Sequence, residues 1–297
     1  MLAVGIGGGG DVVGALAVAQ AARAAGLTAR VGGVTWERLP IDPLPGPRRL
    51  DEVTGAEPLN ASCALAGPDT RGPGGFRFAE ANLARALGEP VLLVDPNPGP
   101  VAVARDVAQA AGALGCDAVA FVDVGGDVLA HGDEPGLGSP LCDSVLLAAA
   151  HHLELPAIGA LFGVGCDGEL TPDEVLARLA EVARAGGLLG SWGITRADAE
   201  VLDAAVAAVP TEASAQAVRC ARGAVGEAPI RAGRRTVPLS PLGAMTFFFD
   251  PEAAVRSAAR LAAAVLHAPT LEDAEDILAA LGIRTELAAE RAAAALA

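Results

Sequence analysis

The segment from residue 91 to residue 124 constrains the fold more than any other part of the chain. It contains VLLVD (91–95), GPVAVARDVAQAAGALG (99–115) and DAVAFVDV (117–124). The first and last stretches are continuously apolar and rich in β-branched residues, which is typical of strands buried on both faces. A helix of the length of 99–115 between two such strands forms a β–α–β crossover, which makes the strands parallel. The segment therefore predicts a parallel sheet covered by helices.

The same alternation of strand, loop and helix continues along the chain. We expect further strands at residues 1–6, 29–34, 156–165 and 236–250. We expect helices at residues 11–26, 139–153, 171–187 and 195–210, a helix of about 15 residues after Asp250–Pro251, and a helical tail from Thr270 onward. Helix starts are signalled by the capping boxes Thr171 to Glu174 and Thr195 to Asp198, and by Ser139 before Pro140.

These elements predict a three-layer, Rossmann-like α/β fold with a mostly parallel sheet and helices on both faces. We expect a single domain over residues 1–297, with a helical C-terminal portion from about residue 251. The proline-rich stretch from Thr35 to Asn60 is expected to be a long loop. A loop of this length is either a lid over a binding site or a plain surface excursion.

Composition and charge exclude several classes of function. The chain has a net charge of −15 and only 3% aromatic residues. A phosphate backbone would repel it and few aromatic side chains are present to stack on bases, so we expect no nucleic-acid partner. Its five cysteines form no C-x-x-C pair, and no apolar run is long enough to span a bilayer. We therefore expect a cytoplasmic protein with reduced thiols and no membrane contact, and a homo-oligomer on base rates alone.

Glycine and aspartate concentrate in the loops that follow the expected strands. These loops are GIGGGGD (5–11), VDPNPGP (94–100), VDVGGDVLAHGDEPGLGSP (122–140) and GVGCDGE (163–169). Ligands of open parallel sheets bind beyond the carboxyl ends of the strands, where these loops lie. The asymmetry predicts a binding site at that edge.

The first loop has the spacing G-x-G-x-x-G at Gly5, Gly7 and Gly10, directly between a strand and a helix. We expect its backbone to bind an anion, together with Gly8, Gly9 and Asp11, because a helix N-terminus presents free N–H groups. The alternative is a tight turn without a ligand. NAD is not expected, because no acidic residue ends the second strand, where Arg30, Gly32 and Gly33 stand instead.

The loop 122–140 is the richest in titratable groups. Asp123 and Asp127 flank Gly125–Gly126, and we expect them to bind Mg²⁺ or Mn²⁺, since these cations prefer oxygen ligands. His131 and Asp127 are the candidate catalytic groups, His131 as the proton carrier. Asp133, Glu134 and Asp143 are either further ligands or ordinary solvated charges. Gly125, Gly126 and Asp95 complete the expected ligand-binding set.

Other residues are weaker candidates. Cys166 is read as a small buried thiol rather than as a nucleophile, because no neighbouring base is evident. Four arginines in or near the loops are either clamps for a carboxylate or phosphate, or surface residues; they are Arg48, Arg49, Arg71 and Arg77.

Three stretches together resemble a family catalogued as a domain of unknown function. They are GIGGGGDVVGALAVA (5–19), GGVTWERLPIDP (32–43) and FVDVGGDVLAHGDEPGLGSPLCDSVLLAAA (121–150). The resemblance covers nearly the whole chain, and it implies that the glycine and aspartate loops belong to one domain. The glycine loop is also similar to that of D-glutamate cyclases, G-I-G-x-G-G-x-x-x-G, although Gly8, Asp11 and Val12 depart from the residues of that family.

The sequence therefore favours an intracellular enzyme, a transferase, hydrolase or lyase, that binds a nucleotide or a phosphorylated metabolite with a divalent metal. One alternative is a cyclase or lyase of an acidic amino acid, whose carboxylates the arginines would hold. Another is a non-catalytic ligand-binding or assembly protein that uses the same pocket.

Overall fold

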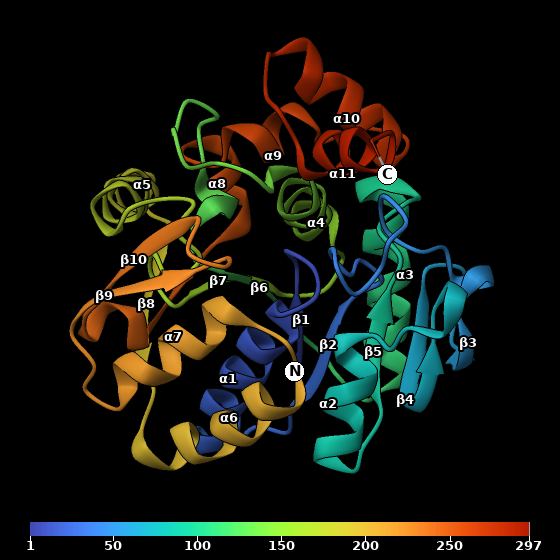
Figure 1. The fold of residues 1–297 in the computed structure, drawn as a ribbon, viewed down its shortest axis with the longest axis horizontal. Coiled ribbons are helices and arrows are strands. Elements are labelled where there is room, and N and C mark those ends of the chain that lie inside the picture. The colour runs from blue at the N-terminus through green and yellow to red at the C-terminus, as the bar shows by residue number, and fades with distance from the viewer. Residues whose placement is uncertain (297) are drawn as a thin grey trace.

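A computed structural model describes residues 1–296, and it has the expected three-layer α/β architecture (Figure 1). The central layer is a nine-stranded sheet in the order β3-β4-β5-β2-β1-β6-β7-β11-β8. Its strands are β1 (Leu2–Gly5), β2 (Arg30–Val34), β3 (Thr54–Pro58), β4 (Cys63–Arg71), β5 (Val91–Val94), β6 (Val119–Val124), β7 (Ala157–Phe162), β8 (Leu188–Gly193) and β11 (Met245–Phe249). The five strands from β5 to β7 are parallel, and the outer strands on both sides are antiparallel.

Helices cover both faces of the sheet (Figure 1). One face packs against α1 (Asp11–Ala24), α2 (Ala79–Leu87), α6 (Arg196–Ala208) and α7 (Glu212–Ala221). The other packs against α3 (Gly99–Ala113), α4 (Pro140–His152), α5 (Pro172–Arg184), α8 (Pro251–Arg256), α9 (Arg260–Ala264) and α10 (Leu271–Ala280). Helix α11 (Glu286–Ala294) contacts α4. None of the helices in residues 1–296 combines the length and apolar character that crossing a bilayer requires.

Alternation along the central strands builds the two cores. In β1, Leu2 and Val4 belong to the core beneath α3 and α4, whereas Ala3 belongs to the core beneath α1. Helix α1 packs closely on the sheet at Gly14, where a Cβ atom would lie 2.5 Å from Cγ2 of Val124. The glycine in this helix is therefore required by packing against β6.

Most of the expected elements are confirmed, and three expectations need correction. The 35–60 stretch is not a continuous loop, because it contains a 3₁₀ turn (Leu50–Glu52) and β3, an exposed edge strand. The stretch 236–250 is two strands in different sheets: β10 (Arg235–Leu239) pairs with β9 (Gly226–Ile230), and β11 joins the main sheet. The helix after Asp250 is interrupted at Ser257, so it forms α8 and α9.

The strand order creates a crevice beside β1. The chain leaves β1 through α1 to reach β2 on one side, whereas β6 pairs with the other side of β1. The loops after β1 and β6 therefore diverge at adjacent carboxyl ends of the sheet. Such a point of reversal is where open α/β sheets bind their ligands.

Candidate metal centre

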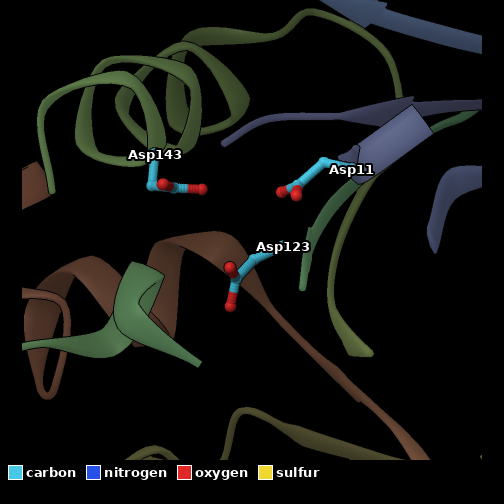
Figure 2. Close-up of side chains that lie close together, drawn as sticks. All are labelled: Asp11, Asp123 and Asp143. Carbon is cyan, nitrogen blue, oxygen red and sulfur yellow. The ribbon is translucent and has the colours of Figure 1, made fainter. Parts of the chain in front are cut away.

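Three aspartates converge in the crevice between β1 and β6. Asp11 is the first residue of α1, Asp123 lies in β6, and Asp143 lies in the first turn of α4. One carboxylate oxygen from each lies within 4.8 Å of the others. Figure 2 shows the three side chains pointing into one small space from three different elements. This set is called the aspartate triad below.

The triad lacks the hydrogen bonds that buried carboxylates normally make. Oδ2 of Asp11 accepts the N–H of Gly7 at 3.0 Å. Oδ2 of Asp123 and Oδ1 of Asp143 are buried and have no hydrogen-bond partner among the described residues. Burying an unpaired charge is costly, so these oxygens need either a proton or a cation.

The pKa values of the triad show the cost of burying these carboxylates close together. Burial raises the pKa of Asp11 to about 7, although the Gly7 N–H and the Arg38 guanidinium oppose the change. Burial, and then repulsion from the neighbouring carboxylates, raises the pKa values of Asp123 and Asp143 well above their usual range. A divalent cation would relieve both causes at once.

A second acidic group lies beside the triad. It consists of Asp127, Asp167 and Glu169, and burial raises the pKa of Asp167 to about 8. Oδ1 of Asp167 is buried without a partner. Glu169 differs, because it accepts four hydrogen bonds: from the N–H groups of Gly138 and Ser139, from the Ser139 hydroxyl and from the Arg231 guanidinium. Glu169 is therefore a structural anchor, and Asp127 and Asp167 keep the free coordination capacity.

At two glycine positions next to the acidic groups, any larger side chain would collide with the carboxylates. A Cβ atom on Gly7 would lie 2.6 Å from Oδ2 of Asp11 and 3.2 Å from Oδ1 of Asp143. A Cβ atom on Gly125 would lie 2.1 Å from Cγ of Asp167, and the φ of +127° there also favours glycine. Gly126 is likewise left-handed and packs against Val175.

The other glycines of the first loop pack against protein segments. The N–H of Gly9 donates to the carbonyl of Trp36 at 3.0 Å, and a Cβ atom on Gly8 would lie 2.8 Å from the same oxygen. A Cβ atom on Gly10 would lie 2.4 Å from Oγ1 of Thr211, and one on Gly5 would meet the backbone of Asp11. Close packing thus accounts for these glycines, and anion binding by the loop stays a prediction.

A cavity of about 770 Å³ opens above the two acidic groups, and it is called the main cavity. Its floor includes Asp11, Asp127, Asp143 and Asp167. Its other walls carry three arginines (Arg38, Arg231 and Arg234) and four glutamates (Glu37, Glu212, Glu286 and Glu290). The lining is therefore acidic overall, and the arginines supply positive groups at its sides, Arg38 paired with Glu286 and Glu290 and Arg231 paired with Glu169.

The sequence matches the family described as "Protein of unknown function (DUF1152)" over residues 2–294. The chain belongs to this family. No curated protein and no solved structure gives a match to the DUF1152 chain.

A further carboxyl pair lies behind the glycine loop of this DUF1152 protein. Glu37 lines the main cavity, and its Oε1 accepts the N–H of Ala79 at the start of α2. Burial raises the pKa of Glu37 to about 7. The next residue of α2, Glu80, is fully buried, and both of its oxygens lack a partner among the described residues. Burial, and then the charge of Glu37, raises the pKa of Glu80 well above its usual range.

Several residues predicted to form the site lie elsewhere in the DUF1152 structure. His131 does not line the main cavity; its Nε2 lies 3.2 Å from Glu181 on α5. The carboxylate of Asp95 accepts hydrogen bonds from the N–H groups of Leu50 and Asn97. Cys166 is buried beside Gly243.

The four loop arginines also lie outside the cavity lining. Arg48 is buried, pairs with Asp42 and binds the carbonyls of residues 44–46, so it holds the 35–60 segment together. Part of that segment, Leu39–Ile41, does line the cavity.

The structure adds residues that the sequence interpretation did not single out. Asp167 lies in a loop that was expected at the site. Arg231 and Arg234 lie in the turn of the β9–β10 hairpin, which was not predicted. The alternating stretches GEAPI and RTVPL around RAGR, with a glycine between them, are a hairpin signal that identifies this turn.

Proposed function

We propose that this protein is an enzyme that acts on a phosphate-bearing small molecule, a nucleotide or a phosphorylated metabolite, with the help of a divalent metal ion. The observation that carries the proposal is the aspartate triad. Two of its members, Asp11 and Asp143, line the main cavity, where Oδ1 of Asp143 is buried without a partner and three arginines stand among the groups of the other walls.

The donor set fits Mg²⁺ or Mn²⁺. The candidate ligands Asp11, Asp123 and Asp143 offer only carboxylate oxygens, and hard cations prefer such ligands. Neither histidine nor cysteine belongs to either acidic group, which disfavours zinc. The metal would supply positive charge for the phosphate and would polarise the reacting group.

The surrounding residues have separate roles in this proposal. Arg231 and Arg234 attract the anionic substrate from the sides of the cavity. Arg38 binds the carbonyl of Gly7 at 2.8 Å and pairs with Glu286 and Glu290, so it fixes the glycine loop next to the triad.

The proton carrier in this account is Glu37 rather than His131. Glu37 lines the main cavity, and a pKa of about 7 suits a group that gives and takes protons at neutral pH. The cavity volume of about 770 Å³ lies within the range of small-molecule sites.

A second candidate function uses the same charges in another way. An acidic amino acid carries an ammonium group and carboxylates, and these complement the acidic floor and the arginines of the cavity. A cyclase or lyase of such a substrate would need no metal. The third candidate function is a protein that binds the ligand in the same cavity without catalysing a reaction.

A thermal-shift screen separates these proposals. Nucleotides, sugar phosphates and acidic amino acids are each added with Mg²⁺, with Mn²⁺ or with EDTA. The proposed function predicts stabilisation by a phosphate compound that depends on the metal, and a ligand at 100 times its Kd adds about 2.7 kcal/mol. Stabilisation by an amino acid in EDTA supports the second candidate and contradicts the first. Metal-dependent binding without turnover of the ligand supports the third.

A further inference from the structure

A second cavity adjoins the main cavity and has the opposite charge. It has a volume of about 710 Å³, and we call it the arginine annex. Three arginines line it: Arg234, Arg235 and Arg284. Among the described residues that form its wall, none carries a carboxyl group. This is unusual surface chemistry for a chain with a net charge of −15.

The annex and the main cavity are neighbours. Gly138, Arg234 and Ala289 line both of them. A ligand held above the aspartate triad can therefore extend past Arg234 into the annex. Arg284 lines the annex but not the main cavity, so a substitution of Arg284 changes the lining of the annex only.

The annex arginines retain donors for a ligand. Arg284 makes no side-chain hydrogen bond or ion pair with the described residues. Arg234 uses only its Nε, which donates to the carbonyl of Arg231 at 3.0 Å. Arg235 donates Nη1 to the carbonyl of Gly168 at 2.9 Å and lies 4.0 Å from Glu169. Most of the guanidinium N–H groups are thus left for an anion, and their planar arrangement suits phosphate oxygens.

The turn that carries Arg234 and leads into Arg235 is held in a strained conformation. Arg231 and Ala232 have φ angles of +52° and +55°, a region that residues other than glycine rarely adopt. The strain persists because the N–H of Arg231 donates to Glu212 at 2.5 Å and its guanidinium donates to Glu169 at 3.0 Å. Strain of this kind concentrates at ligand clamps. The contacts fix the turn between the two cavities.

We propose that the arginine annex binds a second anionic group, a phosphate, of the substrate whose first anionic group lies at the metal centre. The inference rests on the proposed function for the identity of the substrate. Anion binding by the annex itself needs no metal, because its wall carries only positive charge. The substrate class is therefore a compound with two separated or consecutive phosphates.

The test is a calorimetric titration with inorganic pyrophosphate in EDTA. We expect the wild-type protein to bind it, and the Arg284→Gln and Arg234→Gln variants to bind it at least about tenfold more weakly, since each loses a charge-assisted contact. Arg256→Gln is the matched control, because Arg256 is an exposed arginine that pairs with Glu252 on α8. The affinity of this variant for pyrophosphate should equal that of the wild type.

The annex is contradicted if the wild type binds no pyrophosphate, or if Arg284→Gln binds it as tightly as the wild type does. Binding of Mn²⁺ is measured separately on the same protein variants after the EDTA has been removed. Absence of Mn²⁺ binding to the wild type is a failure of the proposed function, and it is distinct from the pyrophosphate result.

Discussion

The Ser139 hydroxyl donates to Oε1 of Glu169 at 2.6 Å, although Ser139 occupies the N-cap position of α4. The sequence predicts a capping role for this serine, and the structure corrects it, since no hydrogen bond links its side chain to the helix. With the N–H groups of Gly138 and Ser139, the bond ties the loop after β7 to the start of α4.

Replacing this serine separates structural support from metal binding. We expect Ser139→Ala to lower the free energy of unfolding by about 1 kcal/mol, because the buried Glu169 carboxylate loses one of its hydrogen-bond donors. Urea denaturation measures the change. The affinity for Mn²⁺ should stay unchanged, and a clear loss of it would place Glu169 among the metal ligands instead.

The Glu37–Glu80 pair should contribute to the pH dependence of the stability of the metal-free protein, in addition to the carboxyl groups of the aspartate triad and of Asp167. The pKa of Glu37 rises from 4.5 to about 7 on folding, and that of Glu80 also rises. Between these pH values the folded state binds more protons than the unfolded state, so stability falls as the pH rises. Each such group contributes a slope of at most about 1.4 kcal/mol per pH unit.

Glu80→Gln tests this dependence, because glutamine keeps the shape and cannot ionise. Chemical denaturation in EDTA, repeated from pH 5 to pH 8, should give a shallower decline for the variant than for the wild type. Parallel curves would show that Glu80 does not hold a proton in the folded state.

The Gly7 position should be intolerant of even one methyl group. We expect Gly7→Ala to weaken Mn²⁺ binding and to destabilise the fold, because the new Cβ would approach the carboxylates of both Asp11 and Asp143. Gly112→Ala is the control: Gly112 lies in α3, and a Cβ there meets no atom within 4 Å. The control should be stabilised by up to about 1 kcal/mol with unchanged Mn²⁺ binding. Equal effects of the two substitutions would contradict the crowding at Gly7.

The architecture follows from local patterns that are legible in the sequence. Buried parallel strands such as β5 and β6 are continuous apolar runs. The capping boxes at Thr171 and Thr195 correctly predict where α5 and α6 begin. The edge strand β3 escapes prediction, because TGAEP is short, polar and exposed. Its strand geometry comes from pairing with β4 rather than from its own residues.

The site was predictable only as far as it depends on the sheet. Asp11 and Asp123 meet because adjacent parallel strands end at the same edge, and this follows from topology. Asp143 looks like an ordinary helix-start charge, and only the packing of α4 brings it into the triad. His131 shares a loop with Asp127, but the 3₁₀ turn Asp127–Leu129 sends the chain toward α5.

The arginines show the limit of sequence interpretation most clearly. Arg231 is more than 100 positions from Asp127 along the chain, although both line the main cavity, and no local periodicity connects them. Their proximity depends on the β9–β10 hairpin, which forms its own small sheet and lies beside the main cavity.

The most direct test of the account is a titration of Mn²⁺ followed by electron paramagnetic resonance, in which bound Mn²⁺ loses the sharp signal of the free ion. The wild type is compared with Asp143→Asn and with Asp133→Asn, an exposed aspartate of the neighbouring loop. We predict saturable binding to the wild type and to Asp133→Asn, and its loss in Asp143→Asn, which should remain folded because a buried charge has been removed. Absence of binding to the wild type, or undiminished binding to Asp143→Asn, would contradict the assignment of the aspartate triad as a metal centre.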